Sequence, residues 1–242
     1  MSGGSPRAPV VLEMQTVSKR YQALRPLRIA ALRVAAGERV SIGGLDAGMG
    51  ELLVNLVTGA SVPDTGEVRV CGRPTTDIAS GDDWLASLDR FGIVSARAVL
   101  LEAATLEQNL AMPFTLAIDP VPQDVAARVR VLAAGCGIEA GRWLETVAGE
   151  LPADVRVRAH LARALAHRPR LVILEHPTAE VSPASRQQLA ADVVRACSGP
   201  EVAAVVLTND DAFGRAVAPR NLRLDGATGV LKPLRRAWFR PG

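Results

Sequence analysis

Lysine is nearly absent from this sequence, in which Lys19 and Lys232 are the only two. Arginine supplies the rest of the 28 basic residues, and 25 acidic residues leave a net charge of +3. So small a charge on 242 residues argues against a nucleic-acid-binding surface as the main function. The scarcity of lysine also matters for phosphate binding, because phosphate-binding loops normally include one.

Cysteine is scarce as well, and Cys71, Cys136 and Cys197 are far apart in the sequence. Their odd number, the absence of a CxxC pair and the lack of histidines at ligand spacing argue against a disulfide framework and against a metal site. We therefore expect reduced thiols in a cytosolic core. No uncharged apolar run reaches the roughly 18 residues that span a bilayer, and residues 1–9 lack the apolar segment of a secretion signal. A membrane role would therefore require a partner.

The first half of the chain alternates short strand-like runs with turn formers. Strands are expected over residues 10–14, 39–42 and 67–71. Two glycines follow residue 42, and apolar residues recur at helical spacing from Leu52 onward. This order predicts a strand, a glycine loop and a helix, which is the layout of a phosphate-binding unit.

The second half predicts helices and buried strands in alternation. Residues 104–150 are helix-prone and interrupted by prolines, which indicates a helical subdomain. A helix over 153–166, a strand over 171–174, a helix over 185–195 and a strand over 202–207 follow, as in right-handed βαβ crossovers of a parallel sheet. Residues 221–231 fit two short strands around a turn. We expect a single domain over residues 1–242.

Several segments, in order and at matching distances, resemble the ABC transporter ATPase family from about residue 11 to residue 231. Residues 161–178 (LARALAHRPRLVILEHPT) are similar to the helix after the signature motif and the Walker B strand. Residues 182–185 and 207–210 resemble the following loop and the switch strand, and residues 105–113 (TLEQNLAMP) resemble the lipoprotein-releasing and macrolide-exporter branch. The resemblance implies an α/β P-loop NTPase fold of the ABC ATPase type. This fold has a mostly parallel core sheet, an N-terminal antiparallel β subdomain and an inserted α-helical subdomain at about 97–152.

The phosphate-binding loop departs from the family pattern. When residues 52–59 are aligned, Gly44 and Gly48 are loop glycines, Gly50 stands at the lysine position and Glu51, before Leu52, stands at the position of the magnesium-binding hydroxyl. A carboxylate facing phosphates opposes their binding by several kcal/mol at an effective dielectric of ~20. Alternatively, Glu51 is an acid at the positive end of a helix.

Other positions that the resemblance assigns to catalysis are also replaced. Glu175 occupies the magnesium-associated aspartate position, and His176 occupies the position of the glutamate that polarises water. His176 could act as a general base, or it could be a packed side chain. Ala96 stands for the family's glutamine, Ser182 for an aspartate and Asn209 for the switch histidine.

The signature motif, usually Leu-Ser-Gly-Gly-Gln, is Leu151, Pro152, Ala153, Asp154 and Val155 in this sequence. Pro152 removes an N–H and a hydroxyl, and Asp154 adds a negative charge facing the γ-phosphate that the family binds there. The same residues also suit a helix start, with proline in the first turn and an acid near the N-terminus.

One residue favours nucleotide binding. Tyr21, the only tyrosine, lies where the family places the aromatic ring that stacks on adenine. A lone aromatic after a first strand is equally a packing residue. Taken together, these positions predict that ATP and Mg²⁺ bind weakly or not at all.

In the family, two domains pair head to tail and share both nucleotide sites, and this sequence departs from the pattern in both halves. The leading hypothesis is a pseudo-ATPase subunit that docks a permease-like membrane partner through a groove around residues 97–113. It would pair with a second nucleotide-binding domain, either another copy or an intact paralogue, on the cytoplasmic face of the membrane. The apolar residues of the groove could equally be interdomain packing. Two alternatives are an active ATPase organised by Glu175 and His176, and a soluble scaffold without a membrane partner.

Overall fold

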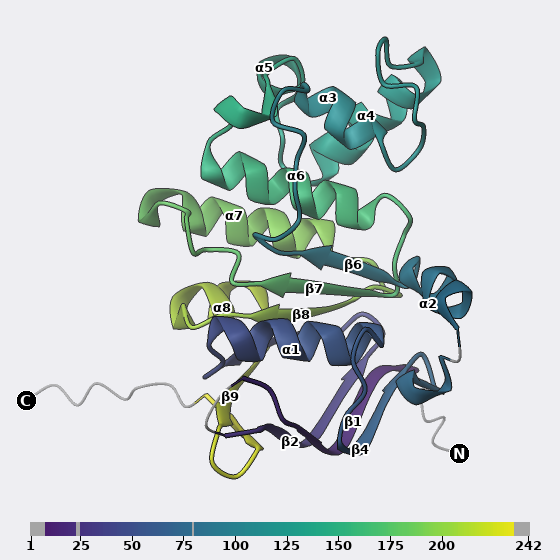
Figure 1. The fold of residues 1–242 in the computed structure, drawn as a ribbon. Coiled ribbons are helices and arrows are strands. Elements are labelled where there is room, and N and C mark those ends of the chain that lie inside the picture. The colour runs from purple at the N-terminus through teal and green to yellow at the C-terminus, as the bar shows by residue number, and fades with distance from the viewer. Residues whose placement is uncertain (1–7, 23–24, 79, 235–242) are drawn as a thin grey trace, which may run out of the picture.

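Two β-sheets and the helices between and beside them form the structure (Figure 1). The computed structural model describes residues 8–22, 25–78 and 80–234. The larger sheet has six strands in the order β10-β9-β3-β8-β7-β6, and only β10 is antiparallel to its neighbour. Its strands are β3 (Arg39–Gly43), β6 (Phe91–Val94), β7 (Leu171–Glu175), β8 (Ala203–Leu207), β9 (Arg220–Asp225) and β10 (Val230–Pro233).

Both faces of the central strands are buried, which explains their uninterrupted apolar sequences. In β7, Val172 and Leu174 pack in one apolar core with the helices on the outer side. Leu171 and Ile173 point the other way, into a second core shared with α1 (Ala47–Thr58) and the smaller sheet. The predicted parallel core sheet is confirmed.

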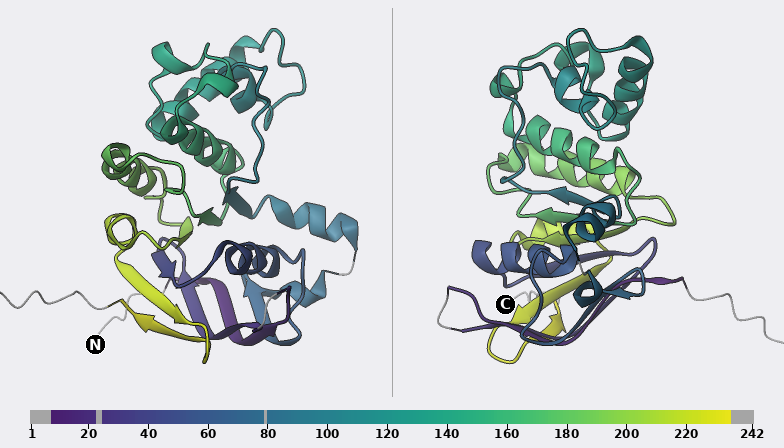
Figure 2. Two further views of the ribbon diagram at one scale, coloured as in Figure 1. Left: turned by 60° about the vertical axis from the view of Figure 1, so that its left-hand side comes forward. Right: turned by 45° about the vertical axis from the view of Figure 1, so that its right-hand side comes forward.

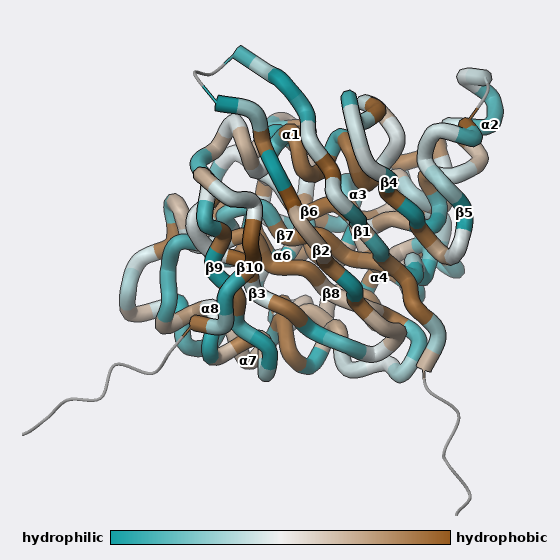
Figure 3. The backbone as a smooth tube through the Cα atoms, turned by 90° about the horizontal axis from the view of Figure 1, so that it is seen from below, coloured by the Kyte–Doolittle hydropathy of each residue, from teal (hydrophilic) through white to brown (hydrophobic). Residues whose placement is uncertain are grey.

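The smaller sheet is antiparallel, in the order β2-β1-β4-β5. It is built from β1 (Val10–Lys19), β2 (Leu27–Ala35), β4 (Thr65–Val70) and β5 (Arg73–Pro74). In Figure 3, apolar positions gather where β1 and β2 overlie the larger sheet. The Ala30 N–H donates to the Gly229 carbonyl at 2.8 Å, which connects β2 to the turn before β10.

Most of the helices lie beyond the opposite face of the larger sheet. Figure 2 shows α3 (Leu106–Ala111), α4 (Gln123–Gly135) and α5 (Ala140–Trp143) at the end of the molecule away from the smaller sheet. These three helices and the 3₁₀ turn Ala148–Glu150 fall within residues 97–152. Between them and the sheet lie α6 (Ala153–Leu165) and α7 (Pro183–Ala196), while α8 (Asp211–Val217) flanks β9. The remaining helix, α2 (Gly81–Leu88), precedes β6, and a 3₁₀ turn covers Thr75–Asp77.

A buried charged network joins α6 to α7. Arg158 donates to the Asp192 carboxylate at 2.8 Å and to the Asp154 carboxylate at 2.5 Å. The Asp192 carboxylate also accepts a hydrogen bond from Arg195 at 2.7 Å. Asp192 is 1% exposed. At Gly137, in the turn after α4, φ is +78°, and a Cβ there would lie 2.4 Å from the Asp192 carboxyl group. The turn after α4 is therefore packed closely against α7.

The cysteines do not all lie in the core, so that expectation is wrong for Cys71. Cys71 is exposed in the turn between β4 and β5, where its φ is +50°. Burial raises the pKa of Cys136 to about 12 and that of Cys197 to about 11. Within the described residues, no helix is both long enough and apolar enough to cross a bilayer.

Candidate functional site

Helix α1 begins earlier than the predicted glycine loop allows. It starts at Ala47, because the Asp46 carboxylate accepts the Met49 N–H at 2.8 Å and caps the helix. Four positions assigned to the loop or its end are therefore helical: Gly48, Gly50, Glu51 and Leu52. A helix N-terminus is where a protein can bind an anion, and here a carboxylate of the chain itself occupies that position.

Arg97 connects Glu51 and Glu175, the acids at the two positions that the family resemblance assigns to magnesium. Its guanidinium pairs with the Glu51 carboxylate and donates to Glu175 Oε2 at 2.7 Å. Glu175 ends β7 with only 8% of its side chain exposed, and Arg97 lies just beyond the end of the parallel neighbour β6. Glu51 is not in the first turn of α1, so its interpretation as a helix-terminal acid is wrong.

Sequence reasoning gave Arg97 no role in the site. Ala96, the position assigned to the family's glutamine, is exposed beyond β6, and Arg97 follows it directly. A signal was present, because two acids that meet at one sheet edge, in a chain almost free of lysine, call for an arginine nearby.

Gly50 packs directly against the end of β7. A Cβ at Gly50 would lie 3.4 Å from Glu175 Oε1 and 3.4 Å from His176 Nε2. His176 has a φ of +45°, and its backbone N–H donates to the Leu207 carbonyl at 2.8 Å. Its buried Nε2 has no hydrogen-bond partner within residues 8–22, 25–78 and 80–234. Gly50, the position assigned to lysine, is therefore packed closely against the Glu175 and His176 side chains.

Asn209 binds the backbone at the start of the loop. Its Oδ1 accepts the Gly44 N–H at 2.8 Å, and its Nδ2 donates to the Leu45 carbonyl at 2.8 Å. At Gly44, φ is +81°, and a Cβ would lie 2.6 Å from the Leu224 carbonyl oxygen, so glycine is required there. The Asn209 amide therefore occupies the Gly44 N–H, a backbone donor of the predicted phosphate-binding loop.

Tyr21 lies against the N-terminal end of α1. A Cβ at Gly48 would be 3.5 Å from Tyr21 Cε2, which places the ring beside the first turn of the helix. Burial and the nearby Asp46 raise the pKa of Tyr21, and its buried hydroxyl has no hydrogen-bond partner among the residues that the structure describes. The Tyr21 ring packs against the apolar core that includes α1, which agrees with the alternative that it is a packing residue.

The signature positions form the entry to α6. Leu151 and Val155 are each 5% exposed. Pro152 stands at the N-cap position, one residue before the first turn in which it was expected, and makes no side-chain cap hydrogen bond. The Asp154 carboxylate is bound by Arg158, a partner that the sequence analysis did not assign.

Ser182 precedes α7, and its hydroxyl pairs with Ser185 Oγ at 3.2 Å without capping the helix. The helix begins at Pro183, so most of the expected loop at 182–185 is helical.

Comparison with known proteins identifies the family. The family model described as ABC transporter matches residues 27–179, which is more than half of the chain. This chain belongs to the ABC transporter family. The resemblance drawn from residues 161–178 is confirmed.

Relatives of this ABC-family chain include the lipoprotein-releasing system ATP-binding protein LolD of Chromohalobacter salexigens. It is 29% identical over 222 residues, which cover 89% of this chain and 91% of the relative. The Fe(3+) ions import ATP-binding protein FbpC of Serratia marcescens is 26% identical over 83% of this chain and 56% of its own length. The likeness to LolD agrees with the branch that residues 105–113 suggested.

Solved ABC structures share the fold at low sequence identity. A dimeric post-hydrolysis state of the ATP-binding cassette MJ0796 bound to ADP and Pi has a TM-score of 0.74 and 20% identity, covering 93% of this chain and 99% of that one. The cbiO1 protein from Clostridium perfringens, part of the ABC transporter complex cbiONQ, has a TM-score of 0.75 and 18% identity, with 93% and 87% covered. The predicted ABC ATPase fold is confirmed.

Proposed function

We propose that this chain is a pseudo-ATPase subunit, which keeps the ABC fold to dock a membrane partner and hydrolyses little or no ATP. The observation that carries the proposal is the Arg97 bridge between Glu51 and Glu175. In an ATP-binding cassette, these two positions would hold a cation together with phosphate oxygens. In this chain an internal guanidinium supplies the positive charge.

The anion side of the site supports the same proposal. Asp46 accepts an N–H at the start of α1, and Asn209 accepts the N–H of Gly44. A triphosphate would have to displace both groups, approach the Glu51 carboxylate and bind without a lysine. The residues present therefore do not fit Mg-ATP.

Similarity to transport proteins supports the partner proposal. The relatives are named as ATP-binding proteins of lipoprotein-releasing and ion-import systems, and a solved cassette of this fold is dimeric. We infer that this chain pairs with a second nucleotide-binding domain and with a permease-like protein on the cytoplasmic face of the membrane.

Titration with a fluorescent ATP analogue and Mg²⁺, together with a phosphate-release assay, tests the proposal. We expect no binding below millimolar concentration and no release above that of the Glu175→Gln variant. Micromolar binding with turnover that the Glu175→Gln change abolishes would overturn it.

Restoring the family residues provides a second test. The Gly50→Lys/Glu51→Ser variant supplies an ammonium and a hydroxyl, and it removes one of the two partners of Arg97. Nucleotide affinity should increase in this variant, and adding Asp46→Asn should increase it further because the competing carboxylate loses its charge. Unchanged affinity in both variants would show that residues 46–51 do not cause the defect.

The alternative of an active enzyme rests on His176, whose buried Nε2 has no hydrogen-bond partner in the described part of the chain and lies near Glu175. If turnover is found, loss of turnover in a His176→Ala variant would favour this alternative. Co-purification with a membrane fraction would distinguish a subunit that docks a membrane partner from a soluble scaffold.

A further inference from the structure

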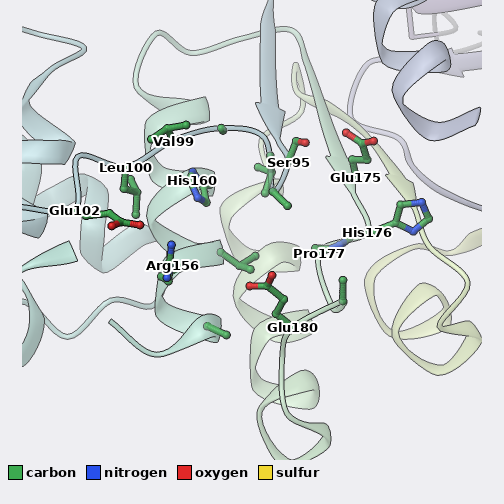
Figure 4. A pocket seen from close by; sticks show the side chains of 16 residues that line it. Ser95, Val99, Leu100, Glu102, Arg156, His160, Glu175, His176, Pro177 and Glu180 are labelled. Atoms are coloured by element: carbon green, nitrogen blue, oxygen red, sulfur yellow. The ribbon is translucent and has the colours of Figure 1, made fainter. Parts of the chain in front are cut away.

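A cavity of about 540 Å³ lies at the end of β7 opposite to the candidate site. Figure 4 shows the cavity of the candidate site, which Glu175 and His176 line at the carboxyl end of β7 and in which burial lowers the pKa of His160 to about 4. The 540 Å³ cavity is lined instead by Arg170 and Val202, which directly precede β7 and β8. The carboxyl ends of α4, α6 and α7 complete its walls. We call this space the amino-end cavity.

Apolar side chains from three helices form most of the lining of the amino-end cavity. Leu132 on α4 and Leu165 on α6 are partly buried, and Cys136 is 1% exposed. Val131 also lines the cavity and is 76% exposed. A volume of roughly 300–1,000 Å³, a mostly apolar lining and a few polar groups are typical of small-molecule sites. The amino-end cavity has all three properties.

Three arginines and one glutamate supply the charged part of this lining. Arg170 pairs with Glu201 at 2.6 Å, and Arg195 pairs at 2.7 Å with Asp192, which does not line the cavity. Within residues 8–22, 25–78 and 80–234, Arg168 takes part in no ion pair and its guanidinium in no hydrogen bond. The guanidinium has five N–H donors in a planar fork that matches a carboxylate. Arg168 is therefore the group in this cavity that is available to an acidic ligand.

The three helix ends at the cavity reduce this preference for an acid only in part. The carboxyl end of a helix carries about half a negative charge, which favours a cation. In each of these helices a carbonyl of the last turn already accepts a hydrogen bond from the residues that follow, at Ala134, Leu165 and Arg195. A guanidinium carries a full charge, about twice that of one helix end. An anion beside Arg168 is therefore favoured over a cation.

The backbone at Arg168 is unfavourable for an arginine. Its φ is +52°, and Pro169 follows it. Left-handed backbone favours glycine, and a residue before proline is usually extended. The chain thus places an arginine where glycine would fit more easily, and the side chain gains no ion pair in the part of the protein that the structure describes. Strained residues of this kind cluster at ligand sites.

We propose that the amino-end cavity binds a small apolar carboxylate. The hydrocarbon part of the ligand lies against Leu132 and Leu165, and its carboxylate pairs with Arg168. The proposal depends neither on ATP hydrolysis nor on a membrane partner, because no lining residue of this cavity belongs to the candidate site.

Calorimetric titration of the whole chain with decanoate, decanol and butyrate tests the chemistry of the ligand. We expect decanoate to bind below millimolar concentration. Decanol has the same chain without the charge and should bind about tenfold more weakly, because it cannot form the charged pair. Butyrate has the charge but lacks six methylene groups, so it should bind at least about tenfold more weakly than decanoate.

Variants of Arg168 locate the carboxylate. Arg168→Gln should weaken decanoate by about tenfold and leave decanol unchanged, and Arg168→Lys should weaken decanoate less because the charge remains. Arg168→Gly should weaken decanoate as Arg168→Gln does without lowering the melting temperature, because the backbone suits glycine. Arg215→Gln, which removes an exposed arginine on α8, is the matched control and should leave binding unchanged.

Two glycines provide a matched test of the cavity volume. Gly135 lines the amino-end cavity and Gly141 does not, and a Cβ at either position would meet no atom within 4 Å. The ring of a Gly135→Phe variant should occupy part of the cavity and weaken both decanoate and decanol by about tenfold. The Gly141→Phe variant should bind both ligands as the unmodified chain does.

The inference would be overturned if decanoate did not bind below millimolar concentration or bound no better than decanol. Decanoate binding that withstands both Arg168→Gln and Gly135→Phe would also overturn it. So would binding to phosphatidylglycerol vesicles that Arg168→Gln abolishes, in a chain that does not bind decanoate, because Arg168 would then contact a lipid surface. ATP turnover would contradict the proposed function and leave the decanoate result unchanged.

Discussion

Replacing Arg97 with glutamine should destabilise the protein by about 2–3 kcal/mol. The change removes a charge-assisted hydrogen bond to Glu175, of a kind that contributes about 1.5–3 kcal/mol. The Glu175 side chain is 8% exposed, so its charge would remain largely buried without a partner. The bond to Glu51 adds at most about 1 kcal/mol, since Glu51 is 52% exposed. The 44% exposure of Arg97 places the total below that for a fully buried pair.

Urea denaturation and thermal unfolding of the Arg97→Gln and Glu175→Gln variants and of the double variant would measure this bridge. The Arg97→Gln variant should melt about 5–10 °C lower, at about 2–4 °C per kcal/mol for a chain of this size. The double variant should be more stable than the sum of the single effects predicts, because removing Glu175 also removes the orphaned charge. A cost below about 0.5 kcal/mol, or simple additivity, would refute the internal-cation argument. Arg215→Gln is the control and should change stability by less than about 0.5 kcal/mol.

Three further predictions concern other parts of the fold. Asn209→Ala should cost about 1–2 kcal/mol and speed amide exchange at residues 44–45, as measured by mass spectrometry, because both bonds to the loop are lost. Gly137→Ala should cost more than about 2 kcal/mol in urea, because the new Cβ would meet Asp192 at 2.4 Å with φ at +78°, whereas Gly141→Ala, with no atom within 4 Å, should be nearly neutral. His160, with its pKa lowered to about 4, favours the folded state when neutral, so this contribution is complete above pH 6.5 and is lost as pH falls toward 4. Comparing wild type with His160→Gln at pH 7 and pH 5 should show a smaller pH dependence in the variant.

The sequence revealed the buried strands better than the exposed ones. β7 and β8 are uninterrupted apolar runs because both of their faces are covered. β2 was missed because two consecutive exposed alanines, Ala30 and Ala31, interrupt its alternation of buried and exposed residues, and α2 was missed because it has only eight residues. The glycines at 48 and 50 suggested a loop, although Asp46 three residues before Met49 is an N-cap pattern that indicates a helix.

The candidate site was predictable in its residues but not in its contacts. Alignment placed Glu51 and Glu175 at positions that share one ion in the family, and the structure brings both acids to one guanidinium. The side chain that joins them comes from a third segment, and its direction depends on how the chain leaves β6. No local pattern in the sequence around Arg97 encodes that direction.

The fit of Gly137 over Asp192 has a mechanical consequence. Asp192 is held by arginines on two sides and covered by the turn after α4, so the helical segment cannot tilt away from α7 without exposing a paired charge. Because Arg158 lies on α6 and Arg195 lies on α7, tilting would leave both ion pairs intact, and its cost is the loss of the packing between Gly137 and Asp192. A force applied at α3 or α4 would therefore be transmitted to the core through this contact. Helices α3–α5 and α7 would then move together as one rigid body.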